Sequence, residues 1–230
     1  MSGAREAAGG GRIVEVSPER LSGWFDRFAE RNGGIDGTTA TDTEVVVTAR
    51  NGTTATATVP FPPLEGSGPP TIRLAIQAKR PRRIGLVLVR LGAHSIGIAE
   101  GGKVLVSRTD RHHVHGRSAA GGWSQQRFAR RREGQARQAL KDAADDIFEV
   151  LVPRAGELAG VLLGGDRRAL DELRSDRRLE PVFSLAAQRV LDVSEPRRAV
   201  LDDAARRARE VAIVIRDGVS PATGTQITGQ

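Results

Sequence analysis

The sequence predicts an α/β protein in which a mixed sheet is flanked by helices, with a small α+β region ahead of it. Two observations support this fold class. Between residues 84 and 109 three strand-like segments follow one another closely, and from residue 124 onward helix-like and strand-like segments alternate. Such alternation after a meander is typical of a mixed sheet covered by helices. We therefore expect a small N-terminal region at 1–83, a second domain at 84–215 and a flexible tail at 216–230.

The N-terminal region opens with a Gly/Ala-rich stretch, 1–11, that we expect to be disordered, and continues with a short strand at 12–16. Ser17 and Pro18 then supply an N-cap and a first-turn proline for a helix. Bulky apolar residues recur in this helix at intervals of three and four: Leu21, Trp24, Phe25 and Phe28. This spacing places them on one face, so we interpret them as a core stripe in preference to a surface for stacking nucleotide bases.

Three further segments of this region have the composition of strands. The segments 43–49 and 54–59 flank an "RNGT" turn and predict a hairpin. The segment "TIRLAIQ" at 71–77 predicts another strand. Between them, residues 60–70 include five prolines and predict an irregular loop.

The second domain starts with three strands, "IGLVLVRL", "HSIGIAE" and "KVLVSRT", the last two joined by a Gly-Gly turn, which predicts an antiparallel meander. A single helix is expected from residue 124 to about 151, with a length of about 40 Å at 1.5 Å per residue. The remaining elements are a strand at 158–165, a helix at 167–175, a strand at 189–194 and a helix at 196–210 that leads into the strand-like "VAIVI".

Composition restricts the classes of function. The chain has no cysteine, which excludes thiolate catalysis, disulfides and cysteine-ligated zinc and fits a reducing cytoplasm. It has neither an export-type apolar segment nor an uninterrupted apolar run of about 18 residues, so we expect a cytoplasmic protein with no membrane partner. It also lacks a GxSxG signature and an obvious pair of carboxylates for acid/base chemistry.

Positive charge is concentrated in one part of the chain. The net charge is +7, and the stretch from Arg108 to Arg137 contains only two acidic residues against eight arginines: 108, 111, 117, 127, 130, 131, 132 and 137. A second basic group follows 71–77 and consists of Lys79, Arg80, Arg82 and Arg83. Arginine pairs with phosphate through two parallel hydrogen bonds and stacks on bases, so the pattern predicts a polyanionic partner. A solvated helix face is the alternative.

The long helix has its charges in an unfavourable order. Its start is basic, and acidic residues gather toward its end: Asp142, Asp145, Asp146 and Glu149. Both placements oppose the helix dipole by a few tenths of a kcal/mol per charge. An anion outside the protein would explain the basic start.

Two further motifs could carry metal or phosphate chemistry. His112, His113 and His115 form an HHxH cluster, but no carboxylate stands at ligand spacing and several arginines lie beside it, so we expect RNA contact or plain exposure and no metal. The segment "VLLGGDRRA" leads from a strand into a helix, where phosphate could bind. It lacks both phosphate-loop spacings, which favours a structural turn. We expect no cofactor.

A glycine and glutamine loop precedes the long helix. Gly121 and Gly122 allow the backbone to approach another molecule closely, and Gln125 and Gln126 each carry an amide that donates and accepts hydrogen bonds. Glutamine orients a water molecule or stabilises an oxyanion but removes a proton poorly. A loop of this kind, 118–126, suits a reaction in which the substrate supplies much of the chemistry.

The segment "HGRSAAGGWSQQRFARRREGQARQALKDAADDIFEVL", 115–151, resembles the part of the middle domain of eukaryotic and archaeal class-1 peptide-chain release factors that carries their GGQ loop. The similarity extends over roughly 84 to 211. Trp123 follows the glycine pair here, so the motif is GxxQ, which is similar to the Vms-like release-factor (VLRF) family of peptidyl-tRNA hydrolases in ribosome rescue. Residues 1–83 do not resemble a domain that reads stop codons.

The resemblance implies hydrolysis of the peptidyl-tRNA ester in stalled ribosomal complexes, without stop-codon decoding. It implies that Gly121 and Gly122 give the loop its reach and that Gln125 positions the attacking water, with Gln126 as the rival. RNA contacts are expected from His115, Arg117, Arg127, Arg130 and Arg131. The expected partners are large-subunit rRNA at the peptidyl-transferase centre and peptidyl-tRNA, bound by a monomer.

Two other functions remain open from the sequence. One is an endonuclease that cuts the acceptor end of the tRNA, because a 2′-hydroxyl of the RNA can serve as the nucleophile. The other is a non-catalytic module that binds rRNA and recognises stalled ribosomes, in which the glutamines have no chemical role.

Overall fold

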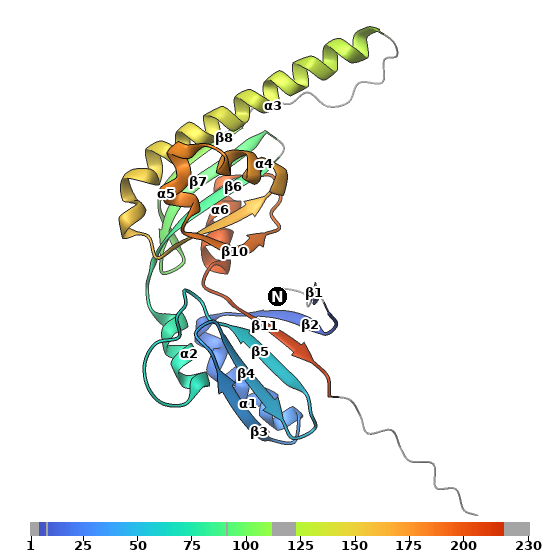
Figure 1. Ribbon diagram of the computed structural model, residues 1–230, viewed down its shortest axis with the longest axis vertical. Coiled ribbons are helices and arrows are strands. Elements are labelled where there is room, and N and C mark those ends of the chain that lie inside the picture. Colours follow the sequence, from blue (N-terminus) through green and yellow to red (C-terminus); the bar gives the residue numbers. More distant parts are fainter. Residues whose placement is uncertain (1–4, 8, 91, 112–122, 219–230) are drawn as a thin grey trace, which may run out of the picture. The chain divides into compact units, whose positions relative to one another are not determined.

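The computed structural model describes residues 5–7, 9–90, 92–111 and 123–218, and within 123–133 it describes only the backbone (Figure 1). The chain divides into two compact units. Unit 1 combines the N-terminal part, as far as Arg80, with the segment that starts at Arg209, and unit 2 comprises Pro81–Ala208. Unit 2 is thus inserted, in sequence, between two parts of unit 1.

Unit 1 contains a six-stranded sheet in the order β1-β2-β11-β5-β4-β3. Every neighbouring pair in it is antiparallel. The strands are β1 (Arg5–Glu6), β2 (Arg12–Val16), β3 (Ile35–Ala40), β4 (Glu44–Ala49), β5 (Thr54–Thr58) and β11 (Val211–Arg216). The predicted hairpin at 43–59 is confirmed as β4 and β5. Strand β3 was not predicted.

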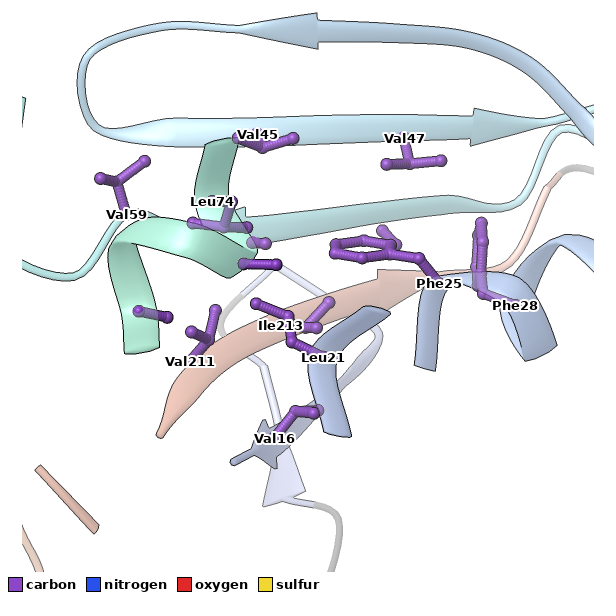
Figure 2. Packing of buried hydrophobic residues seen from close by; sticks show 14 of the residues in the cluster. Val16, Leu21, Phe25, Phe28, Val45, Val47, Val59, Leu74, Val211 and Ile213 are labelled. Carbon is purple, nitrogen blue, oxygen red and sulfur yellow. The ribbon is translucent and has the colours of Figure 1, made fainter. Parts of the chain in front are cut away.

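Helices pack on this sheet and bury the core of unit 1. A short 3-10 helix, η1 (Pro18–Arg20), leads into α1 (Leu21–Arg31), and α2 (Pro70–Lys79) follows the proline-rich loop. The predicted stripe on α1 is confirmed, because Leu21, Phe25 and Phe28 are buried and Trp24 stacks on Phe28. Figure 2 shows Leu21, Phe25 and Phe28 in one cluster with Leu74 of α2 and strand residues that include Val45, Val47, Val211 and Ile213. Burial of such side chains is the main favourable contribution to folding.

The prediction of a strand at 71–77 is wrong, because this segment lies within helix α2. Leu74, Ala75 and Ala78 are buried while Ile72 and Ile76 are 54% and 55% exposed. The alternation Ile72, Leu74, Ile76 in the sequence mimics a strand, but burial follows the helical spacing. Pro70 at the first helical turn has the φ angle that a helix start requires.

Two expectations about the ends of the chain also change. Part of the stretch expected to be disordered, Arg5–Glu6, forms β1 and pairs with β2. The "VAIVI" segment, which the sequence grouped with the second domain, forms β11 between β2 and β5 of unit 1. The expected flexible tail falls mostly outside the described residues.

Unit 2 contains a five-stranded mixed sheet in the order β10-β9-β6-β7-β8. The predicted meander is confirmed as β6 (Arg83–Arg90), β7 (Ala93–Glu100) and β8 (Lys103–Arg111), each antiparallel to the next. β9 (Gly160–Gly165) pairs with β6 in parallel, and β10 (Ala186–Leu191) pairs with β9 in parallel. The predicted class, a mixed sheet flanked by helices, is therefore confirmed.

Helices cover both faces of this sheet. Ile96 and Ile98 pack with α3 (Trp123–Val150), whereas a Cβ atom on Gly97 would lie 2.9 Å from Leu201 of α6 (Arg198–Arg207). Neighbouring strand residues point to opposite faces, so α3 and α6 lie on opposite sides. The short helices η2 (Val152–Glu157), α4 (Arg167–Arg174), η3 (Arg177–Leu179) and α5 (Glu180–Phe183) complete the unit.

Candidate functional site

The predicted loop lies between β8 and α3. β8 ends at Arg111 and α3 begins at Trp123, so Gly121, Gly122, Arg117 and the three neighbouring histidines, His112, His113 and His115, lie outside the described residues. The helix starts one residue earlier than predicted, which places Gln125 and Gln126 in its first turn and Arg127, Arg130 and Arg131 in the turns that follow. The glutamines are thus attached to the end of a helix instead of the expected loop.

The N-terminal half of α3 extends past the sheet (Figure 1). From residue 134, where side chains are described, the first buried side chain is Ala139, followed by Ala143, Ala144, Ile147 and Val150. About 24 Å of helix therefore precede the first of these buried positions, at 1.5 Å per residue. The C-terminal half of α3 packs on the sheet. The N-terminal half extends beyond the sheet and contains the glutamines and arginines that the sequence predicts as site residues.

Two cations continue the basic segment along α3. Arg137 and Lys141 are one turn apart, both are exposed, and neither has an ion pair with another described residue. At 100° per residue, positions 127, 130 and 131 of the backbone fall within the same third of the helix circumference as these two. Four of the five buried residues of α3, Ala139, Ala143, Ile147 and Val150, lie on the opposite side.

A polar cluster with one buried member, His94, connects the packed half of α3 to the sheet. His94 of β7 is 1% exposed, and its Nε2 lies 2.8 Å from Oδ2 of Asp146 in α3. Nη1 of Arg108 in β8 donates to Oδ1 of Asp146 at 2.9 Å and lies 2.5 Å from Oε2 of Glu149. We name His94, Asp146, Arg108 and Glu149 the α3 clasp.

Hydrogen-bond partners differ between the two ring nitrogens of His94. Nδ1 is buried and has no hydrogen-bond partner in the described part of the chain. Because the carboxylate of Asp146 can only accept, the N–H at Nε2 of His94 is the donor between these two residues. Burial of Asp146 raises its pKa, but the hydrogen bonds from His94 and Arg108 outweigh this effect, so the pKa lies below the ordinary value of 3.8.

The end of β8 is held on the other face of the sheet. Nε of Arg111 lies 2.7 Å from Oε1 of Glu195, and Arg197 contacts the other oxygen of Glu195 at 2.7 Å. Arg108 and Arg111, counted in the sequence as part of the basic segment, thus have carboxylate partners within the protein. Among the arginines of this segment whose side chains are described, Arg137 on α3 is the one without an ion pair to another described residue.

Internal partners also explain the acidic end of α3. Asp146 and Glu149 are bound by Arg108, and Asp145 is bound by Arg178 at 3.0 Å. These tertiary contacts offset the unfavourable interaction with the helix dipole. The expectation of an external anion therefore concerns the basic start of the helix, where side chains lie outside the described residues.

The second basic group is largely neutralised. Arg80 forms an ion pair with Glu65, and Arg83 is bound by Glu100 at 3.4 Å and Glu157 at 2.6 Å. These pairs raise the pKa of Arg83 through hydrogen bonds from its guanidinium to Glu157 and Glu100. The group is therefore a weaker candidate for phosphate contact than α3.

The glycine turn before α4 has a structural role. Gly165 has a φ of +101°, and a Cβ atom there would lie 2.1 Å from the carbonyl oxygen of Val89. Asp166 then caps α4 by accepting hydrogen bonds from the backbone N–H groups of Arg168 and Ala169. This carboxylate occupies the helix N-terminus, which supports the interpretation as a turn and disfavours phosphate binding.

Sequence reasoning missed the α3 clasp. Within "HSIGIAE", His94 shares the period of two with Ile96 and Ile98, and a polar residue on an otherwise buried face is the signal that could have identified it. The described residues contain no group of three or more His, Cys, Asp or Glu side chains arranged to hold a metal ion. Their helices include none with the length and apolar character needed to cross a membrane.

Comparisons with known proteins found one curated relative and two solved structures that are similar to this chain. Over 112 residues, or 48% of this chain, the sequence is 30% identical to peptide chain release factor subunit 1 of Thermococcus sibiricus, of which it covers 27%. The solved structure of an archaeal translation termination factor, aRF1, has a TM-score of 0.42 and 14% identity over 85% of this chain and 63% of its own. A structure described as an archaeal protein has a TM-score of 0.38 and 17% identity over 69% and 48%. The chain spans only part of each of these relatives.

A family match covers the part of the chain that contains the predicted site. Residues 82–214, more than half of the chain, match the family described as Actinobacteria/chloroflexi VLRF1 release factor. The match begins beside β6 and ends within β11, so it includes all strands of unit 2, the α3 clasp and the GxxQ segment. The chain belongs to the VLRF1 release factor family.

Proposed function

We propose that this protein is a ribosome-associated peptidyl-tRNA hydrolase that releases nascent peptides from stalled ribosomal complexes in the cytoplasm. The observation that carries the proposal is the position of the GxxQ segment, which joins an anchored strand to the extended end of α3 in a chain of the VLRF1 release factor family. A narrow helical projection suits delivery of a small catalytic group into a confined RNA site.

The chemistry is assigned to the start of α3. Gln125 orients a water molecule toward the carbonyl carbon of the ester between the peptide and the 3′ ribose of the tRNA, and Gln126 is the rival residue. The first backbone N–H groups of a helix have no partners within it. Those of the first turn of α3, from Trp123 on, and of the glycine pair at Gly121 and Gly122 are the proposed donors to the tetrahedral oxyanion.

RNA binding is assigned to the outer side of α3. Arg127, Arg130 and Arg131 are expected to bind phosphates together with the exposed Arg137 and Lys141. Arg117 and His115 would contact RNA closer to the reaction site. This surface docks on large-subunit rRNA and tRNA while the GxxQ segment enters the peptidyl-transferase centre.

The test uses ribosomal complexes that carry a labelled peptidyl-tRNA. The protein and its Gln125→Ala, Gln126→Ala and Gln138→Ala variants are mixed with the complexes, and products are resolved by size and by the tRNA 3′ end. Gln138 is the matched control, because it lies on the same helix and its amide donates to Asp142. We expect Gln125→Ala to abolish release without loss of binding, since removal of one such group elsewhere costs about 10²–10³ in rate.

The same products separate the two other functions. A shortened tRNA would identify an endonuclease, and intact peptidyl-tRNA in complexes that demonstrably bind the protein would leave a non-catalytic binding module. Unchanged release by Gln125→Ala together with loss in Gln126→Ala would transfer the role to Gln126.

A further inference from the structure

We infer that His94, Asp146 and Arg108 are positioning residues for release, because they hold α3 in one register on the sheet and thereby set where Gln125 lies. This inference rests on the proposed function. It assigns control over the placement of the GxxQ segment to a polar cluster that lies far from that segment along α3.

The clasp joins the two chain segments that lead to and from the GxxQ segment. Arg108 lies in β8, the last strand before the GxxQ segment, and Asp146 and Glu149 lie in α3, whose first turn contains Gln125. His94 reaches Asp146 from β7, the neighbour of β8 in the sheet. The strand and the helix are therefore linked through charged hydrogen bonds, which are stronger than neutral ones.

Apolar packing alone specifies the register of α3 weakly. Three of its five buried side chains in the described part are alanines, at 139, 143 and 144. Small side chains present a flat surface on which a helix can slide or rotate at little cost, since few interdigitating atoms are displaced. Directional contacts are needed to select one position.

The hydrogen bonds of the α3 clasp are directional contacts of this kind. Arg108 binds two carboxylates that lie one turn apart on α3. Its contacts therefore change if α3 rotates about its axis and also if α3 shifts along its axis. If α3 moved, Nε2 of His94 would lose Asp146 and stay buried without an acceptor, which is unfavourable. In the observed arrangement Nε2 of His94, Asp146 and Arg108 each have a partner.

The length of α3 amplifies any error at the clasp. From Asp146 to Gln125 the helix spans roughly 30 Å. A tilt of about 10° at the clasp would displace the far end by roughly 5 Å, and misplacement of a reacting group by about 1 Å can cost about 10²-fold in rate. Release should therefore depend on the clasp more strongly than ribosome binding does, because flexible arginines tolerate small displacements.

The experiment measures geometry and activity on the same variants. The chain has no cysteine, so Lys103→Cys on β8 and Gly134→Cys on α3 provide two unique positions for spin labels. Both positions are exposed, and a Cβ atom on Gly134 has nothing within 4 Å. The distance distribution between the labels is recorded for the full chain, and single-turnover release is measured at saturating protein.

Asp146→Ala and Arg108→Gln are compared with the matched control Asp145→Ala. Asp145 is the neighbouring residue on α3, and its replacement by alanine removes the same charge. Its partner is Arg178, and it takes no part in the clasp. We expect the two clasp variants to broaden or shift the distance distribution and to lower the release rate by roughly tenfold to a hundredfold, with half-saturation for binding changed by less than about threefold. The control should keep the distances and the rate of the unmodified chain.

His94→Gln tests the hydrogen bond itself. A glutamine amide nitrogen can take the place of Nε2 and donate to Asp146, so this variant should retain the distances and most of the activity, whereas His94→Leu should lose both. Arg108 is half exposed, so Arg108→Gln keeps the test available if a buried substitution prevents folding. Unchanged distances in Arg108→Gln and His94→Leu would overturn the inference. Absence of release by the unmodified chain would instead refute the proposed function and leave the distance test valid.

Discussion

Ile213 of β11 is paired with Ala57 of β5, so a strand that follows unit 2 in the sequence lies in the middle of the sheet of unit 1. On its other side Ile213 is paired with Val14 of β2. Both ends of unit 2 are therefore joined to the folded core of unit 1, one through α2 and the other through β11.

Removal of β11 should unfold unit 1. A chain that ends at Ala208 loses the buried Val211, Ile213 and Ile215 and leaves β2 and β5 with unpaired edges. We expect the amide signals of unit 1 in a two-dimensional NMR spectrum to collapse while those of unit 2 persist. A chain that ends at Gly218 is the control and should keep both sets. Retention of dispersed unit 1 signals without β11 would contradict this prediction.

Gln77 should be essential to the proline-rich loop. It is 2% exposed, donates to the carbonyl oxygens of Pro60, Phe61 and Pro63, and accepts from the N–H of Glu65. Gln77→Leu should lower the free energy of unfolding by about 1–3 kcal/mol and speed hydrogen exchange at the Glu65 amide, because buried groups lose their partners. Urea denaturation checks the first effect. Ile76→Ala, at an exposed neighbouring position, should change stability by less than about 0.5 kcal/mol.

Gly165→Ala should destabilise unit 2. The substituted Cβ would lie 2.1 Å from the carbonyl oxygen of Val89, and the φ of +101° is unfavourable for any residue with a side chain. We expect a loss of at least about 1–3 kcal/mol in urea denaturation. Gly156→Ala is the matched control for Gly165→Ala, because a Cβ atom at position 156 has no other atom within 4 Å. Equal stability of the two variants would show that the turn adapts.

Asp146 should stabilise the protein at neutral pH and lose this effect in acid. Its pKa in the folded protein lies below the ordinary value of 3.8, so the stabilisation is complete above that value and disappears as pH falls through the lowered pKa. Asp146→Asn should therefore be less stable than the unmodified chain at neutral pH, and the difference should shrink below about pH 4. Denaturant unfolding across this range, with Asp145→Asn in parallel, provides the measurement. If the difference in stability between Asp146→Asn and the unmodified chain did not depend on pH, Asp146 would act through packing and not through its charge.

Arg137 and Lys141 should contribute to the salt dependence of ribosome binding. Replacement of both by glutamine should reduce the log–log slope of affinity against salt by roughly 0.7–0.9 for each phosphate that the protein no longer neutralises. Arg31→Gln changes an exposed cation on α1 of unit 1 and should leave the slope unaltered. Equal slopes for all variants would identify the basic face of α3 as a solvated surface.

Much of the fold could be predicted because local pattern and tertiary environment agree. The strands β6 to β9 are apolar runs bounded by turns, and the stripe from Leu21 to Phe28 has helical spacing. The candidate site was found through the glycine pair, the glutamines and the arginines that follow them, and the family match supports the part of the chain in which they lie. Their roles stay predictions, since Gly121 and Gly122 fall outside the described residues.

The amino-acid sequence was enough to predict the type of most elements, the location of the basic segment and the family. It did not predict that 71–77 is helical, that β11 belongs to unit 1, or that Asp146 pairs with His94 and Arg108. The two groups of features differ in the range of the interactions that fix them. Periodicity and turn chemistry act over a few residues, whereas strand order and the partners of a buried charge depend on segments that meet only when the chain has folded.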